Sequence, residues 1–156
     1  MRRQRPIGPP RVGSIASVTE PAEPTMTVLV YSDDVDTRER VKQAIGRRPA
    51  ADVPRVTWLE CATAAAVISA LDKGGVDVAI LDGEATPFGG MGIARQAKDE
   101  IFQCPPIVVL TGRVADSWLA NWSRAEAAVP HPLDPIVLAK TVADLMRRRR
   151  TELAPS

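Results

Sequence analysis

The chain has little of what a membrane protein or a disulfide-stabilised protein needs. No apolar stretch approaches the roughly 20 residues required to span a bilayer. Residues 1 to 6 are basic and lead into proline and glycine, without the apolar segment of a signal peptide. Only two cysteines are present, Cys61 and Cys104, and their expected places at opposite edges of a sheet are too far apart for a disulfide bond. The sequence therefore predicts a cytoplasmic protein without a membrane span.

The chain also lacks a strong charge of either sign. It has 20 Lys and Arg against 19 Asp and Glu, a net charge of +1. The basic residues are concentrated near the two ends, so residues 26 to 146 are mildly acidic, which argues against a nucleic-acid-binding face on the folded part. The run Arg147 to Arg150 is a candidate contact for nucleic acid, a membrane surface or an acidic partner. Such a run is more often the solvated end of a helix, where it compensates the helix dipole.

Composition divides the 156 residues into three parts, of which one is a folded domain. Residues 1 to 25 contain five prolines and no hydrophobic periodicity, which predicts a disordered N-terminal extension. Residues 26 to 148 are the expected domain, and residues 149 to 156 the expected basic, disordered tail. Met26 stands directly before the first predicted strand and is a candidate for the true start of the protein.

From Met26 onward, short apolar runs alternate with helical patterns. The predicted strands are residues 27–32, 55–60, 76–82, 106–111 and 127–129, and each is followed by a predicted helix, the last from about 135 to 148. The strands are apolar almost throughout, as is typical of strands that a parallel sheet buries on both faces. Right-handed crossovers then give a five-stranded parallel sheet in a (βα)5 doubly wound, three-layer α/β sandwich.

Three aspartates stand at the carboxyl ends of predicted strands: Asp33 and Asp34 after the first, and Asp82 at the end of the third. In open α/β folds this edge of the sheet carries the chemistry. Carboxylates 4 to 5 Å apart repel by about 3 to 4 kcal/mol per pair at an effective dielectric near 20. No Lys or Arg lies at a neighbouring strand tip, so the sequence predicts a divalent cation bound through oxygen, with Mg²⁺ the best candidate. The alternative, in which Asp33 or Asp36 caps the following helix, accounts for one acid only.

Two other polar residues are expected at the same edge. Thr111 ends the fourth strand, where its hydroxyl can donate to a phosphoryl oxygen, and Gly112 after it leaves room for that group. His131, the only histidine, follows the fifth strand. A lone histidine is usually structural or solvated, but beside three acids an imidazolium is a suitable cationic partner.

The order of these residues from Met26 to about Arg148 resembles the receiver domain of two-component response regulators, which has the flavodoxin-like, CheY-like fold. The resemblance rests on four motifs: the acidic pair and helix start Asp33-Asp34-Val35-Asp36-Thr37-Arg38; the phosphoacceptor strand end Leu81-Asp82 with Pro87 and Gly90 downstream; the hydroxyl site Val109-Leu110-Thr111-Gly112; and His131-Pro132, where the family has a lysine followed by a cis proline.

The resemblance implies that Asp82 accepts a phosphoryl group from a histidine kinase. It implies that Asp33, Asp34 and Asp82 hold Mg²⁺ together with a backbone carbonyl near Glu84, and that Thr111 detects the product. The added charge then biases a surface of loop and helices between two states. Beyond self-phosphorylation from a phosphodonor and self-dephosphorylation, no enzymatic activity is expected.

The expected output is a contact with an effector protein, because no DNA-binding domain is expected in this chain. Trp118 and Trp122 lie one turn apart on the fourth helix, with Trp122 expected to face inward and Trp118 to be the exposed anchor. This helix and the last helix would form the effector surface. An arrangement in which both rings pack locally against the last helix is equally compatible with the sequence.

Three departures from the family pattern leave a second interpretation open. His131 replaces the lysine with a group whose charge depends on pH, Ala128 stands where the family usually has an aromatic switch residue, and Pro87 comes one residue later than usual. These features suit a pseudo-receiver, a scaffold that works without phosphorylation.

A third interpretation is a phosphatase of the haloacid dehalogenase type. The segment Asp34-Val35-Asp36-Thr37 loosely resembles the Asp-x-Asp-x-Thr signature of those enzymes, and Thr111 their second motif. No acidic metal motif follows Thr111, which makes this the least favoured of the three.

Overall fold

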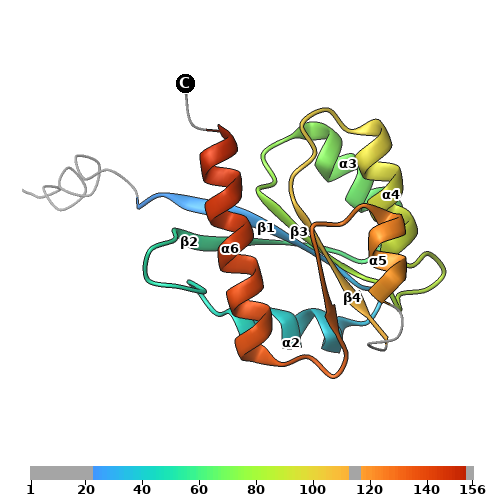
Figure 1. The fold of residues 1–156 in the computed structure, drawn as a ribbon, viewed down its shortest axis with the longest axis horizontal. Helices are drawn as coiled ribbons and strands as arrows, with labels where there is room; N and C mark the ends of the chain where they lie inside the picture. The colour runs from blue at the N-terminus through green and yellow to red at the C-terminus, as the bar shows by residue number, and fades with distance from the viewer. Residues whose placement is uncertain (1–22, 113–116, 154–156) are drawn as a thin grey trace, which may run out of the picture.

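The computed structural model describes residues 23–112 and 117–153, which form one parallel sheet and its helices (Figure 1). The strand order across the sheet is β2-β1-β3-β4-β5. The strands are β1 (Thr25–Tyr31), β2 (Arg55–Cys61), β3 (Val78–Asp82), β4 (Ile107–Thr111) and β5 (Ala127–Pro130). They alternate with the helices α2 (Val35–Ile45), α3 (Ala64–Lys73), α4 (Gly90–Glu100), α5 (Ser117–Ser123) and α6 (Pro135–Leu153). The predicted doubly wound α/β fold is confirmed.

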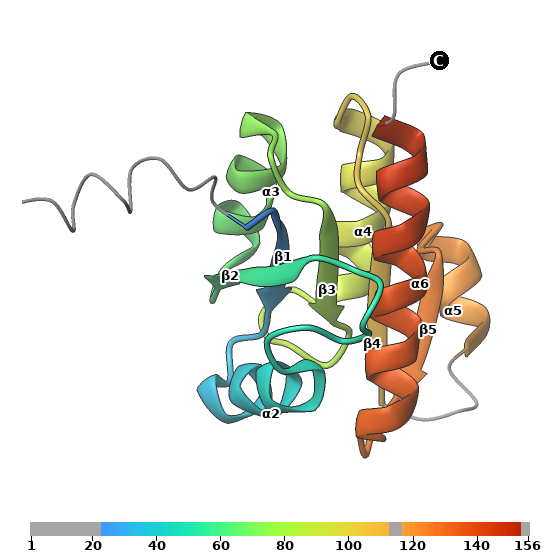
Figure 2. The ribbon, with the colours of Figure 1, turned by 90° about the vertical axis from the view of Figure 1, so that its left-hand side faces the viewer.

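The helices cover both faces of the sheet because successive side chains of a strand point to opposite faces. Val28 and Val30 of β1 pack in the core beneath α2 and α6, whereas Leu29 and Tyr31 pack in the core beneath α3 and α4. Helix α5 packs against α4 on that second side. Helix α6 spans the height of the domain in both views (Figures 1 and 2). Burial on both sides explains why β3 and β4 are apolar throughout, apart from the polar residue at the tip of each.

The close approach of α4 to β3 fixes the loop that follows Asp82. A Cβ atom on Gly90, the first residue of α4, would lie 2.7 Å from the backbone carbon of Leu81. Glycine is therefore required where the helix begins, since that backbone atom cannot move aside. The loop between β3 and α4 begins at the carboxyl edge of the sheet, because it follows Asp82 at the end of β3.

The predicted ends of two elements are wrong. Strand β1 starts at Thr25, inside the segment predicted to be disordered, and α6 continues to Leu153, so that residues 149 to 153 of the expected tail are helical. The guanidinium of Arg147 binds both carboxylate oxygens of Asp52, and Arg148 pairs with Glu152 one turn later. These contacts lie in the part of α6 that follows its last buried residue, Met146. Residues 1 to 22, 113 to 116 and 154 to 156 lie outside the described residues, and with them most of the predicted N-terminal extension, the start of the predicted fourth helix and the end of the predicted tail.

The two tryptophans of α5 are both exposed, which corrects the inward placement predicted for Trp122. The exposed fractions are 64% for Trp118 and 47% for Trp122. The guanidinium of Arg95 on α4 lies 4.9 Å from the ring centroid of Trp122 and donates to its backbone carbonyl at 2.7 Å. This cation–π contact holds the ring at the surface, against α4 rather than against the last helix.

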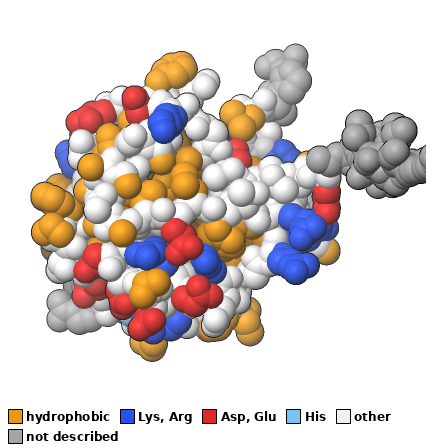
Figure 3. Space-filling view, turned by 180° about the vertical axis from the view of Figure 1, so that it is seen from behind, with side chains coloured by type: hydrophobic (Ala, Val, Ile, Leu, Met, Phe, Trp, Pro, Cys, Tyr) orange, Lys and Arg blue, Asp and Glu red, His pale blue; other side chains and the backbone are white. Residues whose placement is uncertain are grey.

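The surface seen from behind carries acidic and basic side chains together, with hydrophobic ones between them (Figure 3). This face therefore has no single-sign patch of the kind that nucleic acids select. Within the described residues, every helix is too short or too polar to cross a bilayer.

Candidate functional site

The register of the sheet gathers residues from four separate segments at its carboxyl edge. Tyr31 pairs with Leu81, so the residues after β1 lie beside Asp82, and Thr111 pairs with Pro130, so the residues after β4 and β5 lie together. A pocket of about 400 Å³ opens at this edge. Its lining residues are Asp33, Asp34, Thr37, Arg40, Asp82, Glu84, Gly112 and His131. The structure thus places all three strand-tip aspartates and the only histidine around one pocket.

Asp82 lies at the floor of this pocket with 4% of its surface exposed. One carboxylate oxygen, Oδ2, accepts a hydrogen bond from Ser32 Oγ at 2.8 Å, and Oδ1 accepts one from the backbone N–H of Glu84 at 2.9 Å. His131 Nε2 lies 3.6 Å from Oδ1, and it is a buried atom without a hydrogen-bond partner among the described residues. Two donors therefore hold a buried carboxylate in place, and His131 Nε2 beside it can still form a hydrogen bond.

Asp34 is the N-cap of α2. Its Oδ1 accepts from the backbone N–H of Asp36 at 2.9 Å, and its Oδ2 accepts from Thr37 Oγ1 at 3.1 Å. The bond from the Asp36 N–H is the main cause that lowers the pKa of Asp34, and the Thr37 hydroxyl adds to it. The capping role that the alternative gave to Asp33 or Asp36 therefore belongs to Asp34.

Asp33 holds the loop between β3 and α4. Its two oxygens accept from the backbone N–H and the hydroxyl of Thr86 at 3.1 and 3.0 Å. Tyr31, the last residue of β1, binds the same loop, because its hydroxyl donates a hydrogen bond to the backbone carbonyl of Phe88 at 2.5 Å. Burial raises the pKa of Tyr31, and the charges of Asp33 and Asp82 raise it further, so the hydroxyl keeps the proton that it donates.

The carboxylates suit Mg²⁺ by chemistry but are not gathered into a ligand group. Asp33, Asp34 and Asp82 offer hard oxygen ligands, and each uses two of about four acceptor positions, so each can accept another bond. In the part of the chain that the structure describes, however, no three His, Cys, Asp or Glu side chains lie close enough together to bind a metal ion. The three acids therefore line one pocket, as predicted, while Asp33 and Asp34 are directed to Thr86 and to α2. The binding of Mg²⁺ stays a prediction.

The roles predicted for the Thr111 hydroxyl and the Glu84 backbone carbonyl stay predictions, and the structure shows where the two residues lie. Thr111 is buried at the tip of β4, its backbone carbonyl accepts from the His131 N–H at 2.8 Å, and its neighbour Gly112 is the residue that lines the pocket. A Cβ atom on Gly112 would lie 2.5 Å from Glu84 Oε1, so the Glu84 carboxylate occupies the space above this glycine. The observed contact of the Glu84 backbone is made by its N–H to Asp82.

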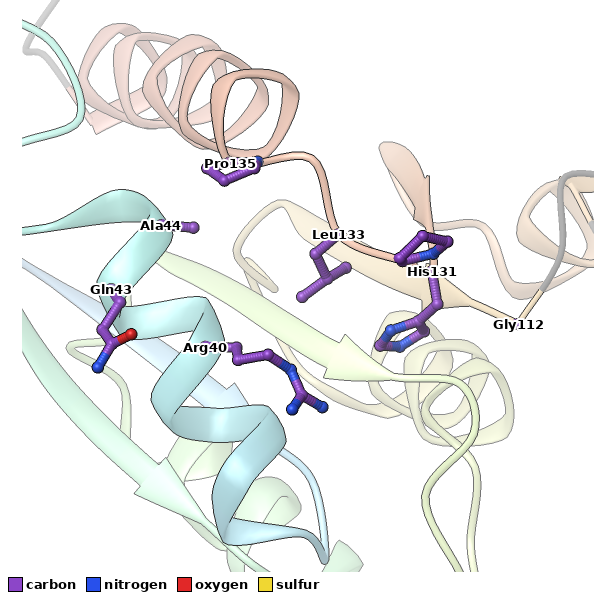
Figure 4. A pocket seen from close by; sticks show the side chains of 8 residues that line it. Arg40, Gln43, Ala44, Gly112, His131, Leu133 and Pro135 are labelled. Carbon is purple, nitrogen blue, oxygen red and sulfur yellow. The ribbon is translucent and has the colours of Figure 1, made fainter.

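Two residues of the site were missed in the sequence analysis. Ser32 is fully buried and donates to Asp82, and its Oγ also accepts from the Asp34 N–H at 3.1 Å. Its place directly before the acidic pair was the available signal. Arg40 lines the pocket from α2 and also lines an adjoining pocket of about 700 Å³ with His131 (Figure 4). Helical spacing from Asp34 was the only signal for Arg40, and it does not define where a long side chain ends.

Comparisons with known proteins identify the family. No protein-family model matches the chain. Two curated proteins of Mycobacterium tuberculosis, from strains H37Rv and CDC 1551 / Oshkosh, are each named an uncharacterized response regulatory protein. Each is 64% identical to this chain over 122 residues, which cover 78% of this chain and 92% of the relative. The chain belongs to the response regulator family.

The fold of this response regulator agrees with a solved receiver structure. A CheY-like receiver domain protein from Methanospirillum hungatei JF-1 superposes with a TM-score of 0.66 at 16% identity, covering 83% of this chain and 99% of that one. Such low identity carries information on the fold alone. The predicted resemblance to CheY-like receiver domains is confirmed. The peptide bond between His131 and Pro132 is cis, as that resemblance implied.

Proposed function

We propose that this response regulator accepts a phosphoryl group from a histidine kinase on Asp82 and passes the signal to another protein. The observation that carries the proposal is the surroundings of Asp82. It is a buried carboxylate at a strand tip, held by Ser32 and the Glu84 N–H, and it faces the unpartnered Nε2 of His131. We also propose that the exchange takes place in the cytoplasm, as is usual for the family.

The chemistry requires one new bond and one broken bond. A carboxylate oxygen of Asp82 attacks phosphorus, and the donor leaves with the electron pair of its own bond to phosphorus. Ser32 and the Glu84 N–H fix the orientation of the nucleophile, and His131 Nε2 is placed to donate to an oxygen of the transferred group.

Mg²⁺, when bound, would neutralise charge on the transferring phosphoryl group. Asp33, Asp34 and Asp82 are the residues that would hold it, with the Glu84 backbone carbonyl as the proposed fourth ligand. Both oxygens of Asp33 already accept hydrogen bonds from Thr86, in the loop between β3 and α4, so a metal ion bound by Asp33 would share those oxygens with that loop. Loading this site and moving the loop between β3 and α4 are therefore linked.

Phosphorylation can be tested with acetyl phosphate and Mg²⁺ on the full chain, followed by intact-mass spectrometry. We expect one acid-stable, base-labile phosphoryl group per chain, absent from Asp82→Asn and retained by Asp52→Asn, a control at an exposed aspartate far from the pocket. A wild-type protein that stays unmodified under these conditions, with and without Mg²⁺, would contradict the proposal.

The proposed output surface consists of α5 and α6. Its support is the exposure of Trp118 and Trp122 on α5 and of Ile136, 80% exposed, at the start of α6. Comparing the pull-down of effectors by the wild type and Trp118→Ala tests this surface, and loss of binding in Trp118→Ala is expected. Equal binding by both proteins would place the output elsewhere.

A phosphorylation-independent scaffold is the second candidate. The observation that favours it is that Asp33 is bound by Thr86 and Asp34 by the first turn of α2. In that case Asp82→Asn and Asp82→Glu would leave effector binding unchanged while Trp118→Ala abolishes it. The haloacid dehalogenase interpretation is not retained for a member of the response regulator family. Both oxygens of Asp34, its required nucleophile, are engaged at the start of α2.

A further inference from the structure

We infer that Arg40 is a phosphoryl-binding residue of this site, supplying the permanent positive charge of the Asp82 pocket. The inference rests on the proposed function and extends it to a residue on α2. Of the described residues that line the pocket, four are acidic, and Arg40 is the only lysine or arginine. A transferred phosphoryl group adds about −1.5 to −2 charges to this pocket, so a fixed cation there has a large effect.

Helical geometry separates Arg40 from the other basic residues of α2. Arg38 and Lys42 are four residues apart and share one face, where both bind the carboxylate of Glu60 on β2 at 3.1 and 2.9 Å. Arg40 lies between them in sequence and so projects from a different side of the helix. Its guanidinium forms no ion pair with any residue that the structure describes, and Nη2 donates a 3.3 Å hydrogen bond to Thr37 Oγ1.

The direction of the Arg40 side chain brings its charge to the pocket. Arg40 is six residues beyond the N-cap Asp34, about 9 Å along the helix axis, and long side chains on a helix point back toward its N-terminus. Figure 4 shows the guanidinium extending from α2 toward His131 across the space between them. The Arg40 charge already contributes to lowering the pKa of Asp34, so it acts on the acidic cluster.

An arginine is suited to this role because its planar guanidinium can donate two parallel hydrogen bonds to phosphoryl oxygens. With no carboxylate to hold it, Arg40 is free to turn from Thr37 to a phosphoryl group on Asp82. In the transfer step, Asp82 forms the new bond to phosphorus, and acetate or the donor histidine leaves with the electron pair. Arg40 makes and breaks no bond, and stabilises the charge on the oxygens that surround phosphorus.

The test compares phosphorylation rates of the full-length wild type, Arg40→Ala, Arg40→Lys and Arg47→Ala with acetyl phosphate and Mg²⁺. Arg47 follows α2, does not line the pocket, and controls for the loss of one positive charge. We expect Arg40→Ala to lower the rate about tenfold or more, equivalent to about 1.4 kcal/mol, with Arg47→Ala unchanged and Arg40→Lys in between. Added guanidinium ion at non-denaturing concentration should restore part of the Arg40→Ala rate, which a purely structural role of Arg40 would not predict.

A second measurement separates this inference from the proposed function. Inorganic phosphate is titrated into wild type and Arg40→Ala, and the NMR shifts of the Gly112 and His131 amides are followed. Shifts in the wild type that Arg40→Ala loses support the anion-binding role even if Asp82 is never phosphorylated. Equal phosphorylation rates in wild type and Arg40→Ala would overturn the inference. If the wild type is not phosphorylated, the inference is overturned when inorganic phosphate causes no NMR shifts in the wild type, or causes equal shifts in the wild type and in Arg40→Ala.

Discussion

The hydrogen bond from Ser32 to Asp82 allows a quantitative test of the site. Ser32 is fully buried, its hydroxyl donates to Asp82 Oδ2 at 2.8 Å, and it accepts from the Asp34 N–H at 3.1 Å. Ser32→Ala removes one of the two donors to a carboxylate that is only 4% exposed. Hydrogen bonds to charged groups contribute about 1.5 to 3 kcal/mol, and the Asp34 N–H also loses its acceptor. We therefore expect Ser32→Ala to lower the free energy of unfolding by about 2 kcal/mol.

Urea denaturation at pH 7 measures this loss, since a domain of this size is expected to unfold in one cooperative transition. Ser69→Ala, an exposed serine on α3, is the control and should change stability by less than about 0.5 kcal/mol. A double-mutant cycle with Asp82→Asn isolates the charge, because a charge-assisted hydrogen bond is about twice as strong as a neutral one. The expected coupling is about 1 kcal/mol. A coupling near zero would refute the argument that Ser32 holds the Asp82 carboxylate.

Two further predictions concern the frame around the site. Gly90→Ala should destabilise the domain by more than 1 kcal/mol, because its Cβ would lie 2.7 Å from backbone of Leu81, whereas Gly92→Ala, two residues later on α4 with nothing within 4 Å, should stabilise it by about 0.5 to 1 kcal/mol. Urea midpoints decide this, and equal effects of the two changes would contradict it. Arg147 lowers the pKa of Asp52 to about 2, so this pair should stabilise the fold fully above pH 4, and less as the pH falls toward 2. The stability difference between wild type and Asp52→Asn should accordingly shrink over that range, and a constant difference would argue against the pair.

The hydrogen bonds between Asp33 and Thr86 connect the pocket to the loop that precedes α4. The Asp33 carboxylate joins the acidic edge of β1 to the loop after β3 through two hydrogen bonds. Any ligand that draws Asp33 toward Asp82 competes with Thr86 for its oxygens. Changes at Asp82, the proposed phosphoacceptor, would therefore affect the segment that leads into α4, the helix on which α5 packs.

The sequence determined the fold because the signals for it are local. Apolar runs such as Ile107–Thr111 are too short for helices and can be buried on both faces only in a parallel sheet, so the strand count and the carboxyl edge followed directly. The positions of Asp33, Asp34 and Asp82 at strand tips were likewise readable, since the end of a strand can be located in the sequence. The resemblance to response regulators rested on the same residues.

Tertiary structure alone decided what each of these residues binds. Ser32 is 50 residues from Asp82, and Asp33 is 53 residues from Thr86, so their hydrogen bonds depend on the register of β1 against β3 and on the path of a loop. The partner of Arg147 on α6 is likewise distant in sequence, because Asp52 lies 95 residues before it. Arg40 lines the pocket because it projects from a different side of α2 than Arg38 and Lys42, which bind Glu60. The hydrophobic pattern of a sequence predicts which face of a helix or strand a residue lies on. The partner of a charged side chain depends on which residues the fold places within a few ångströms of it.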